Sequence, residues 1–257
     1  MISSFVLGLA IAAAYFAATW AISVRIRNYG LLDVAFSYGV AILAPIYAWT
    51  GPGFAARKWA FAAIGAVWSL RLGTYILVRV IRRHPAEDAR YASLRLRWPG
   101  PLGFLVFFEL QALLVAVFSL PFLFASFNPA PAIAAVEIVG LTLAAAGVLG
   151  ETVADLQMQA FKRDPANRGR VCEIGLWRYS RHPNYFFESL VWWGFFVAAL
   201  GSPYGWLTIA CPLLMLYFLL RVTGIPLTEE YAVQSKGDAY REYQRTTSGF
   251  IPWLRRR

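Results

Sequence analysis

Seven apolar runs, each close to or above the length that crosses a bilayer, dominate this sequence. A membrane-spanning α-helix needs about 20 mostly apolar residues. Because a backbone in lipid must satisfy its own hydrogen bonds, such runs are expected to form helices. The sequence therefore predicts an all-α, polytopic membrane bundle with about seven transmembrane helices. The predicted spans are residues 3–24, 31–50, 59–81, 102–125, 131–157, 183–200 and 205–223.

The composition agrees with a membrane protein and leaves no separate soluble domain of useful size. Hydrophobic residues make up 59% of the 257 residues, and charged residues only 15%. We therefore expect a single membrane domain over residues 1–257. The first run is too long for the core of a signal peptide and is expected to remain as a helix. The two cysteines, Cys172 and Cys211, have no metal-type spacing, so neither a metal site nor a disulfide framework is expected.

The distribution of lysine and arginine predicts the orientation of the chain. With the amino terminus outside, the outer segments hold only Arg57 and Lys58. The positive-inside rule then favours an odd number of spans and a cytoplasmic carboxy terminus. The net charge of +10 is assigned to the cytoplasmic face, where it faces membrane lipids or an anionic ligand rather than nucleic acid. The inner segments hold Arg25, Arg27, Arg82, Arg83, Arg90, Arg95, Arg97, the basic residues from Lys162 to Arg181, Lys236, Arg241, Arg245 and Arg255–Arg257.

Ionisable residues within the predicted spans are candidates for function, because a charge in lipid is costly. Two of them, Glu137 and Arg221, lie near span ends, where they could reach the interface. Asp33 and Arg71 form either a structural ion pair between two helices or part of a site. The remaining residues of this kind are Glu109, Glu151, Asp155 and Glu188.

Polar and aromatic residues share one face of the third span. Trp68, Arg71, Tyr75 and Arg79 recur at spacings of three and four residues. A helix face that carries a guanidinium and a phenol is expected to line a polar cavity rather than to contact lipid.

A basic and aromatic segment, FKRDPANRGRVCEIGLWRYSRHPNYFFE, covers residues 161–188. Pro183 suits the first turn of a helix, with His182 before it as the cap. The free N–H groups at such a helix start attract anions. From Lys162 to Arg181 the segment holds six basic and two acidic residues, and Trp177 and Tyr185 can stack on flat rings. It is therefore either a membrane anchor or a binding site for an anionic, aromatic ligand.

This segment, together with the tail EEYAVQSKGDAYREYQRTTSGFIPW, resembles the membrane steroid 5-alpha-reductase superfamily, in particular its bacterial branch DUF1295. The resemblance is strong over residues 150–257 and weaker before them. It implies a multi-pass protein of the bacterial plasma membrane. Residues 1–130 would hold the substrate side, and residues 131–257 the cofactor half, with a cytoplasmic loop 158–182 and a tail 224–257.

The resemblance further implies that the cofactor half binds NADPH. Glu188 would lie near the nicotinamide amide and the basic residues near the phosphates, with Arg168 and Arg170 among the phosphate contacts. The other residues carried over are Asp155, Lys162, Trp177, Arg181, His182, Asn184, Tyr185, Arg221, and Tyr240 or Tyr243.

The substrate side departs from the family pattern. Steroid 5-alpha-reductases carry a Gln-Glu pair on an early helix and a tyrosine on the following helix. Here the early helix reads LLDVAFSYG, where Asp33 is the one carboxylate and Tyr38 the nearest phenol. Tyr75 on the next helix is the counterpart of the family's tyrosine. We expect Tyr75 or Tyr38 to donate a hydrogen bond to a substrate carbonyl, with Asp33 and Arg71 orienting them.

Three functions remain open from the sequence. The first is an NADPH-dependent reductase of an activated carbon–carbon double bond in a lipophilic, steroid-like or isoprenoid substrate. The second is an S-adenosylmethionine-dependent methyltransferase of the isoprenylcysteine carboxyl methyltransferase type, with which Glu229 and Glu230 are compatible. The excess of basic residues favours the phosphorylated ligand. The third is a non-enzymatic transporter or assembly factor, for which a polar stripe continuous across the bilayer would be expected.

Overall fold

The computed structural model describes residues 1–88, 90–91, 94, 97–98 and 100–255. It is 79% helical, and the described residues contain no strand, so the all-α prediction is confirmed. Arg95, Arg256 and Arg257, which entered the charge distribution above, lie outside the described residues. The chain forms two compact units. The first is Met1–Glu137 with Ala199–Trp206, and the second is Ile138–Ala198 with Leu207–Arg257.

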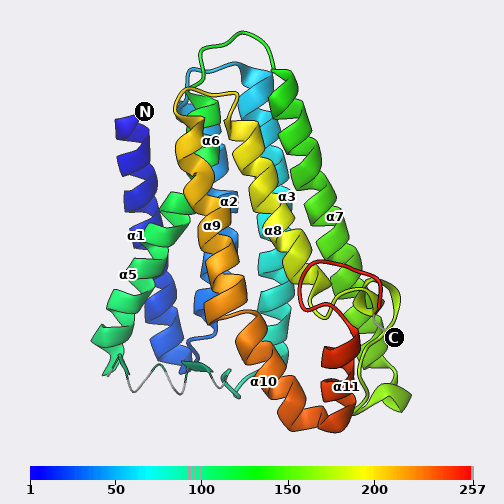
Figure 1. Cartoon of the computed structure of the whole chain (residues 1–257). Helices are drawn as coiled ribbons and strands as arrows, with labels where there is room; N and C mark the ends of the chain where they lie inside the picture. Colours follow the sequence, from blue (N-terminus) through cyan, green and yellow to red (C-terminus); the bar gives the residue numbers. More distant parts are fainter. Residues whose placement is uncertain (89, 92–93, 95–96, 99, 256–257) are drawn as a thin grey trace. The chain divides into compact units, whose positions relative to one another are not determined.

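The first unit is built around a central helix, α2 (Leu31–Thr50). It packs against α1 (Ile2–Ile26), α3 (Ala55–Arg83), α5 (Gly100–Phe118) and α6 (Leu120–Ser126), and α1 also lies beside α5 (Figure 1). Large side chains such as Phe16, Tyr47 and Phe108 are fully buried among these helices. Between helices in a bilayer, such packing stabilises the unit through van der Waals contacts.

The second unit contains most of α7 (Ala135–Arg163) and α8 (Pro183–Ala199), followed by α9 (Ala210–Tyr217). A π-helical turn, η4 (Phe218–Val222), leads into α10 (Ile225–Lys236) and α11 (Asp238–Thr246). Short 3₁₀ turns lie in the loop before α8, at η1 (Pro165–Asn167) and η2 (Gly175–Arg178). A third, η3 (Gly205–Ile209), precedes α9.

Small residues bring α7 and α8 close together. Gly140 lies against Ala198, Gly194 against Ala144, and Gly147 against Val191, so the two helices run antiparallel. A Cβ atom at Gly140 would lie 2.1 Å from the backbone nitrogen of Ala198. Larger side chains on this seam would separate the helices, and seams of small residues of this kind are typical of helix pairs in membranes.

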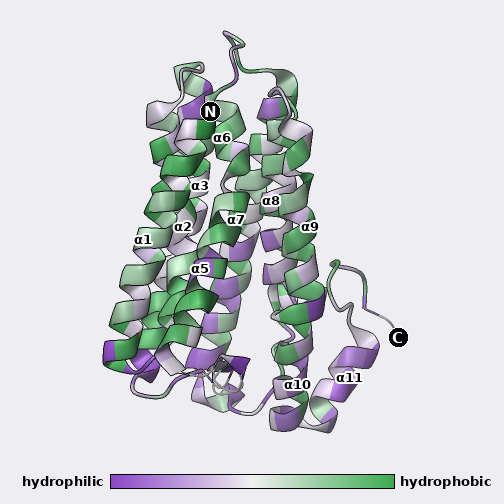
Figure 2. Ribbon diagram, turned by 90° about the vertical axis from the view of Figure 1, so that its left-hand side faces the viewer, coloured by the Kyte–Doolittle hydropathy of each residue, from purple (hydrophilic) through white to green (hydrophobic). Residues whose placement is uncertain are grey.

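Six helices of the described chain are long and apolar enough to cross a membrane. Five are α1, α2, α3, α5 and α7, and the sixth is the segment Gly205–Lys236, which comprises η3, α9, η4 and α10. The remaining predicted span, residues 183–200, forms α8, whose 17 residues lie at the lower limit of a spanning helix. These helices are mostly green in Figure 2, whereas α11 is mostly purple. The structure is thus that of an integral, multi-pass membrane protein, and the sides on which its termini lie stay predictions.

The predicted span 102–125 is wrong as a single helix. The chain forms α5 and α6 with a break at Ser119. Pro121 explains the break, because proline has no N–H and its ring clashes with the carbonyl of residue 117, four positions earlier. The serine hydroxyl donates a hydrogen bond to the Ala116 carbonyl at 2.7 Å, which satisfies one of the carbonyls at the end of α5.

Candidate functional site

The loop between α7 and α8 is fastened to α7 by glutamine and tryptophan side chains. Gln157 Oε1 accepts a hydrogen bond from the backbone N–H of Leu176 at 2.9 Å. Trp177 Nε1–H donates to the Ala154 carbonyl at 2.9 Å. Gly175 has a φ of +56°, and a Cβ atom there would lie 2.3 Å from the Gln157 amide, so only glycine fits this turn. These contacts fix the path of the loop toward Arg181 and His182.

Arg181 lies at the centre of a network that holds the carboxy-terminal tail. Its Nε donates to Glu229 Oε1 at 2.6 Å. Its Nη1 donates to the carbonyls of Gln244 at 3.0 Å and Thr247 at 2.6 Å, which are free carbonyls at the end of α11. A guanidinium in this position also interacts favourably with the helix dipole. We call Arg181, His182, Glu229, Gln244 and Thr247 the tail clasp.

Glu229 of α10 receives three side-chain donors within the clasp. Besides Arg181, His182 Nε2 lies 3.2 Å from Oε1, and Gln244 Nε2 donates to Oε2 at 2.9 Å. The backbone strengthens the same junction, because Arg181 N donates to the Ser248 carbonyl at 2.8 Å. The sequence-predicted site residues Arg181 and His182 therefore connect the loop to the tail.

Three of the predicted tyrosines also belong to this junction. Tyr243 is buried, and its hydroxyl donates to the carbonyls of Trp177 and Ser180. Tyr240 packs edge-to-face on Tyr243 with ring centroids 5.7 Å apart. Tyr185 stacks flat on the imidazole of His182 at 5.3 Å. These aromatic rings therefore pack beside the clasp.

The remaining cofactor candidates divide into exposed cations and buried polar groups. Arg168 and Arg170 are exposed on the loop, Lys162 is exposed near the end of α7, and Arg221 is exposed on η4. Asp155 and Glu188 are buried, and Glu188 Oε1 accepts a hydrogen bond from Trp192 Nε1 at 3.0 Å. In the first turn of α8, the buried Oδ1 atom of Asn184 has no hydrogen-bond partner within the described part of the chain.

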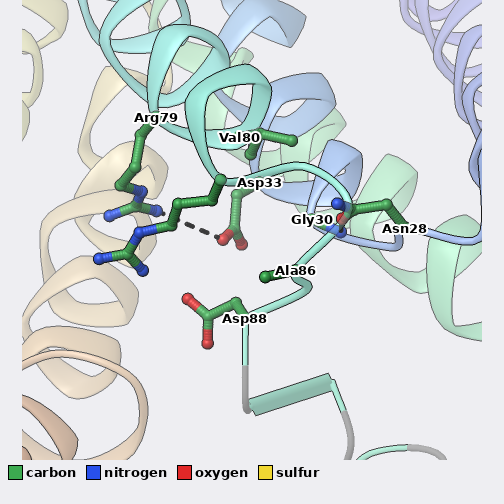
Figure 3. A pocket seen from close by; sticks show the side chains of 8 residues that line it. Asn28, Gly30, Asp33, Arg79, Val80, Ala86 and Asp88 are labelled. Carbon is green, nitrogen blue, oxygen red and sulfur yellow. Dashed lines mark hydrogen bonds and ion pairs between the residues drawn. The ribbon is translucent and has the colours of Figure 1, made fainter.

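The substrate-side candidates lie in the first unit, where Asp33 has a partner that the sequence did not indicate. Its Oδ2 accepts from Arg90 Nη2 at 2.6 Å, and its Oδ1 accepts from the Tyr91 hydroxyl at 3.0 Å. Arg79 Nη2 is 3.9 Å from the same carboxylate (Figure 3). Among the described residues, the ion-pair partners of Asp33 are thus Arg90 and Arg79 rather than Arg71.

The two candidate phenols lie on neighbouring helices. Tyr38 of α2 rests its ring over Gly73 of α3, and its hydroxyl is 2.9 Å from Thr74 Oγ1. Tyr75 lies one helical turn beyond Arg71 on α3, as the spacing predicts. The structure therefore brings Tyr38 to the α3 helix that carries Arg71 and Tyr75, and pairs Asp33 with Arg90.

Comparison with known protein families decides the family of this chain. A family described as "Protein of unknown function (DUF1295)" matches residues 19–247. The chain belongs to the DUF1295 family. This is a family of the steroid 5-alpha-reductase-like superfamily, so the resemblance stated from the sequence is confirmed. No curated protein and no solved structure shows significant similarity to the chain.

The DUF1295 match runs from α1 to the last residue of the tail clasp, Thr247. Both compact units are therefore covered by the family. No group of three or more histidine, cysteine, aspartate or glutamate side chains in the described part of this family member is placed to hold a metal ion.

Sequence reasoning missed a buried ion pair in this DUF1295 protein. Arg57 and Glu137 are both fully buried, with Nε and Oε1 2.6 Å apart. Arg57 also donates to the carbonyls of Asn128, Ala130 and Ala132. The interpretation that Glu137 reaches the membrane interface is therefore wrong. The one signal in the sequence was the single arginine of an outer segment, whose partner Glu137 lies 80 residues further along the chain.

His182 predicts an acid sensitivity of the clasp. Burial lowers the pKa of His182 below its ordinary value of 6.5, although Glu229 acts in the opposite direction. At pH values below 6.5 the unfolded chain therefore binds a proton at His182 more readily than the folded chain does. The stability that is present above pH 6.5 is lost as the pH falls through the lower pKa of His182 in the folded protein. We expect His182→Gln to lose less stability than the wild type between pH 7 and about 5, measured by thermal unfolding in detergent. Equal losses in the two proteins would contradict this role.

Proposed function

We propose that this DUF1295 protein is an integral membrane, NADPH-dependent reductase of an activated carbon–carbon double bond in a lipophilic, steroid-like or isoprenoid substrate. Its family membership and its spanning helices support a membrane enzyme of the reductase superfamily. Bound NADPH would supply the hydride. Residues of the second unit would hold the cofactor. Residues that would orient a substrate carbonyl belong to the first unit.

The observation that carries the proposal is a set of free cations at the end of α7 and on the loop before α8. Arg163, Arg168, Arg170 and Arg178 are exposed, and within the described chain none of them has an ion-pair partner. Arginine binds phosphate through parallel hydrogen bonds, so four free guanidiniums in sixteen residues suit a ligand with several phosphate groups. S-adenosylmethionine carries no phosphate and a single carboxylate, so it would use fewer of these guanidiniums.

A second observation concerns Asn184. Among the described residues its buried Oδ1 has no donor, and leaving such an acceptor unsatisfied costs about 1 to 3 kcal/mol. A ligand N–H group, such as that of a carboxamide, would satisfy it. We assign Asn184, Tyr185 and Glu188 to this end of the cofactor, and Asp155, Lys162 and Arg221 to its surroundings.

The contacts of the tail clasp favour the reductase over the methyltransferase. The methyltransferase alternative used Glu229, but this carboxylate is already engaged by Arg181, His182 and Gln244. We therefore assign Arg181, His182, Trp177, Tyr240 and Tyr243 to holding the wall of the cofactor site rather than to direct contact with the cofactor.

On the substrate side, we propose Tyr75 or Tyr38 as the donor to the substrate carbonyl. Arg71 shares a helix face with Tyr75 and would orient it. Asp33 acts as a positioning residue through its hydrogen bonds to Arg90 and Tyr91. A donor aimed at the carbonyl stabilises the negative charge that develops there during reduction.

The experiment is a thermal-shift measurement on the detergent-solubilised protein. NADPH at about 100 times its dissociation constant is expected to stabilise the protein by about 2.7 kcal/mol, and S-adenosylmethionine is expected to have little effect. The double variant Arg168→Gln, Arg170→Gln should lose most of the NADPH effect, because it removes two phosphate contacts.

The matched control is Arg25→Gln, which removes an exposed arginine from the end of α1. It should respond to NADPH as the wild type does. A larger shift with S-adenosylmethionine would favour the methyltransferase. No shift with either compound would favour the non-enzymatic alternative and overturn the proposal.

A further inference from the structure

The segment that ends the described chain exposes large apolar side chains. After α11, residues 247–255 turn back toward the loop before α8, in red in Figure 1. Within this segment Ile251, Trp253 and Leu254 are exposed, at 59%, 71% and 76%. A group of exposed apolar side chains indicates a surface that contacts another molecule or a membrane.

Hydrogen bonds hold this segment against the loop before α8. The Ser180 hydroxyl donates to the Phe250 carbonyl at 2.8 Å. The backbone N–H of Trp253 donates to the Tyr179 carbonyl at 2.9 Å. The Phe250 ring also packs edge-to-face on Phe186 of α8, with ring centroids 5.9 Å apart. The exposed side chains are therefore presented by a backbone that is fixed to the rest of the second unit.

The loop before α8 extends this apolar surface. Its residues Ile174 and Tyr179 are exposed. The ion pair between Arg255 Nη1 and Glu173 Oε2, 2.5 Å apart, brings the end of the segment beside Ile174. We call the five exposed side chains the apolar edge: Ile174, Tyr179, Ile251, Trp253 and Leu254.

The exposed surface of α7 indicates where the hydrocarbon layer ends. Exposed apolar side chains on this helix occur from Ile138 to Leu156. These two residues are 18 positions apart, so they lie about 27 Å apart along the helix axis. The hydrocarbon layer of a bilayer is about 30 Å thick. The exposed cations Lys162 and Arg163 follow within two turns, so the boundary between acyl chains and head groups lies near Leu156.

Contacts with α7 place the apolar edge at this boundary. The indole of Trp177 donates to the carbonyl of Ala154, which lies two residues before Leu156. Tyr179 follows Trp177 by two residues, and Trp253 is bonded to its carbonyl. Tryptophan and tyrosine are enriched at the level where head groups meet acyl chains. The position of the apolar edge therefore indicates that it contacts the membrane surface.

The size of the apolar edge argues against a protein partner. A stable protein–protein interface buries about 800 Å² and roughly 20 to 30 residues on each side. The five side chains of the apolar edge fall well short of that number. A bilayer sets no such minimum, because each apolar side chain that enters it adds to the binding as its surface leaves water.

We propose that the apolar edge inserts into the surface of the bilayer and anchors the carboxy-terminal segment there. Ile251, Trp253 and Leu254 lie between the head groups and the acyl chains. The hydrogen bond from Trp253 to Tyr179 attaches the loop before α8 to the same anchor. The tail 224–257 thus ends at the membrane surface rather than in water. The proposal is independent of the reductase, because the apolar edge contains no residue assigned to the cofactor or the substrate.

The test uses a nitroxide spin label on the full chain in phosphatidylcholine vesicles. The label is attached through Leu254→Cys, in a background in which the two buried native cysteines are replaced by alanine. Its collision rates with oxygen, which concentrates among acyl chains, and with a water-soluble nickel chelate are compared. We expect the ratio of oxygen to nickel collisions to be severalfold higher than for a label at Arg241→Cys, an exposed position on α11.

Removing apolar side chains should release the anchor. In the double variant Ile251→Ser, Trp253→Ser the ratio at Leu254→Cys should fall to that at Arg241→Cys, because little apolar surface remains to enter the bilayer. Trp206→Ser is the matched control, since it removes an exposed tryptophan of the first unit, and it should leave the ratio unchanged.

Two outcomes would overturn the proposal directly. One is a ratio at Leu254→Cys equal to that at Arg241→Cys without further substitution, and the other is an unchanged ratio in the double variant. Low collision rates with both reagents, together with spectral broadening between labels, would overturn it in favour of a second copy of the chain. If the double variant does not fold, the ratio at Leu254→Cys still decides whether the segment lies in the membrane or in water.

Discussion

Replacing Glu137 with alanine is expected to lower the free energy of unfolding by about 3 to 5 kcal/mol. The change leaves the fully buried guanidinium of Arg57 without its carboxylate. The backbone carbonyls of Asn128 and Ala130 still accept hydrogen bonds from Arg57, but they cannot balance its charge. Glu137 Oε2 also accepts from the backbone N–H of Ala134 at 2.7 Å, so the start of α7 loses an acceptor. Thermal or denaturant unfolding in detergent measures the loss.

Two further variants show whether the buried charge is the cause. The double variant Arg57→Met, Glu137→Leu removes both charges and should recover part of the loss, because apolar side chains can replace a buried ion pair. Glu242→Ala, at an exposed i,i+3 pair with Arg245, should cost no more than about 1 kcal/mol. If Glu137→Ala lowered the free energy of unfolding no more than Glu242→Ala does, the buried ion pair would not contribute the stability that the structure indicates.

Replacing Arg181 with alanine is expected to release the carboxy-terminal tail. The variant loses the contact with Glu229 and the two carbonyls at the end of α11. We expect the free energy of opening of residues 238–250 to fall by about 2 to 4 kcal/mol. Amide hydrogen exchange reports this as faster exchange in α11, because local opening exposes its backbone. Arg181→Lys should be intermediate, since lysine keeps the charge but lacks the planar fork.

Arg241→Ala is the control for the tail. Its guanidinium is 60% exposed and pairs with the exposed Asp238, so its loss should leave exchange in α11 nearly unchanged. Unaltered exchange in Arg181→Ala would mean that the clasp does not hold the tail. If Arg181 only supports the cofactor site, NADPH should still stabilise Arg181→Lys. A complete loss there would instead indicate direct contact with the cofactor.

The start of α8 is an element that could be predicted from the sequence. Pro183 begins the helix, as its fixed φ and missing N–H favour. The interpretation of the basic segment before it, as an anchor or as a site for an anionic, aromatic ligand, stays a prediction. The role of its members was not predictable, because the residues that engage Arg181 lie 48 to 66 positions later in the chain. Whether an arginine is free for a ligand depends on such distant partners.

Asp33 shows the same limit on the substrate side. Helical spacing placed Trp68, Arg71 and Tyr75 on one face of α3. Arg79, one turn further along this helix, lies 3.9 Å from Asp33 in the structure. Arg90, which lies 57 residues from Asp33, could not be chosen over Arg71 by any local rule. The stretch of polar residues after α3 was visible in the sequence, but its contact with the start of α2 was not.

The sequence by itself determined that this protein is helical and that its helices lie in a membrane. The reason is that the length and apolarity of a run decide locally whether it can form a helix in a bilayer. Its basic loop and tail also determined the family. Only the tertiary structure decided which charges neutralise one another, as for Arg57 with Glu137, Asp33 with Arg90 and Arg181 with Glu229. The physical reason is that the cost of a buried charge is relieved by whichever opposite charge the fold brings within a few ångströms, however far away it lies along the chain.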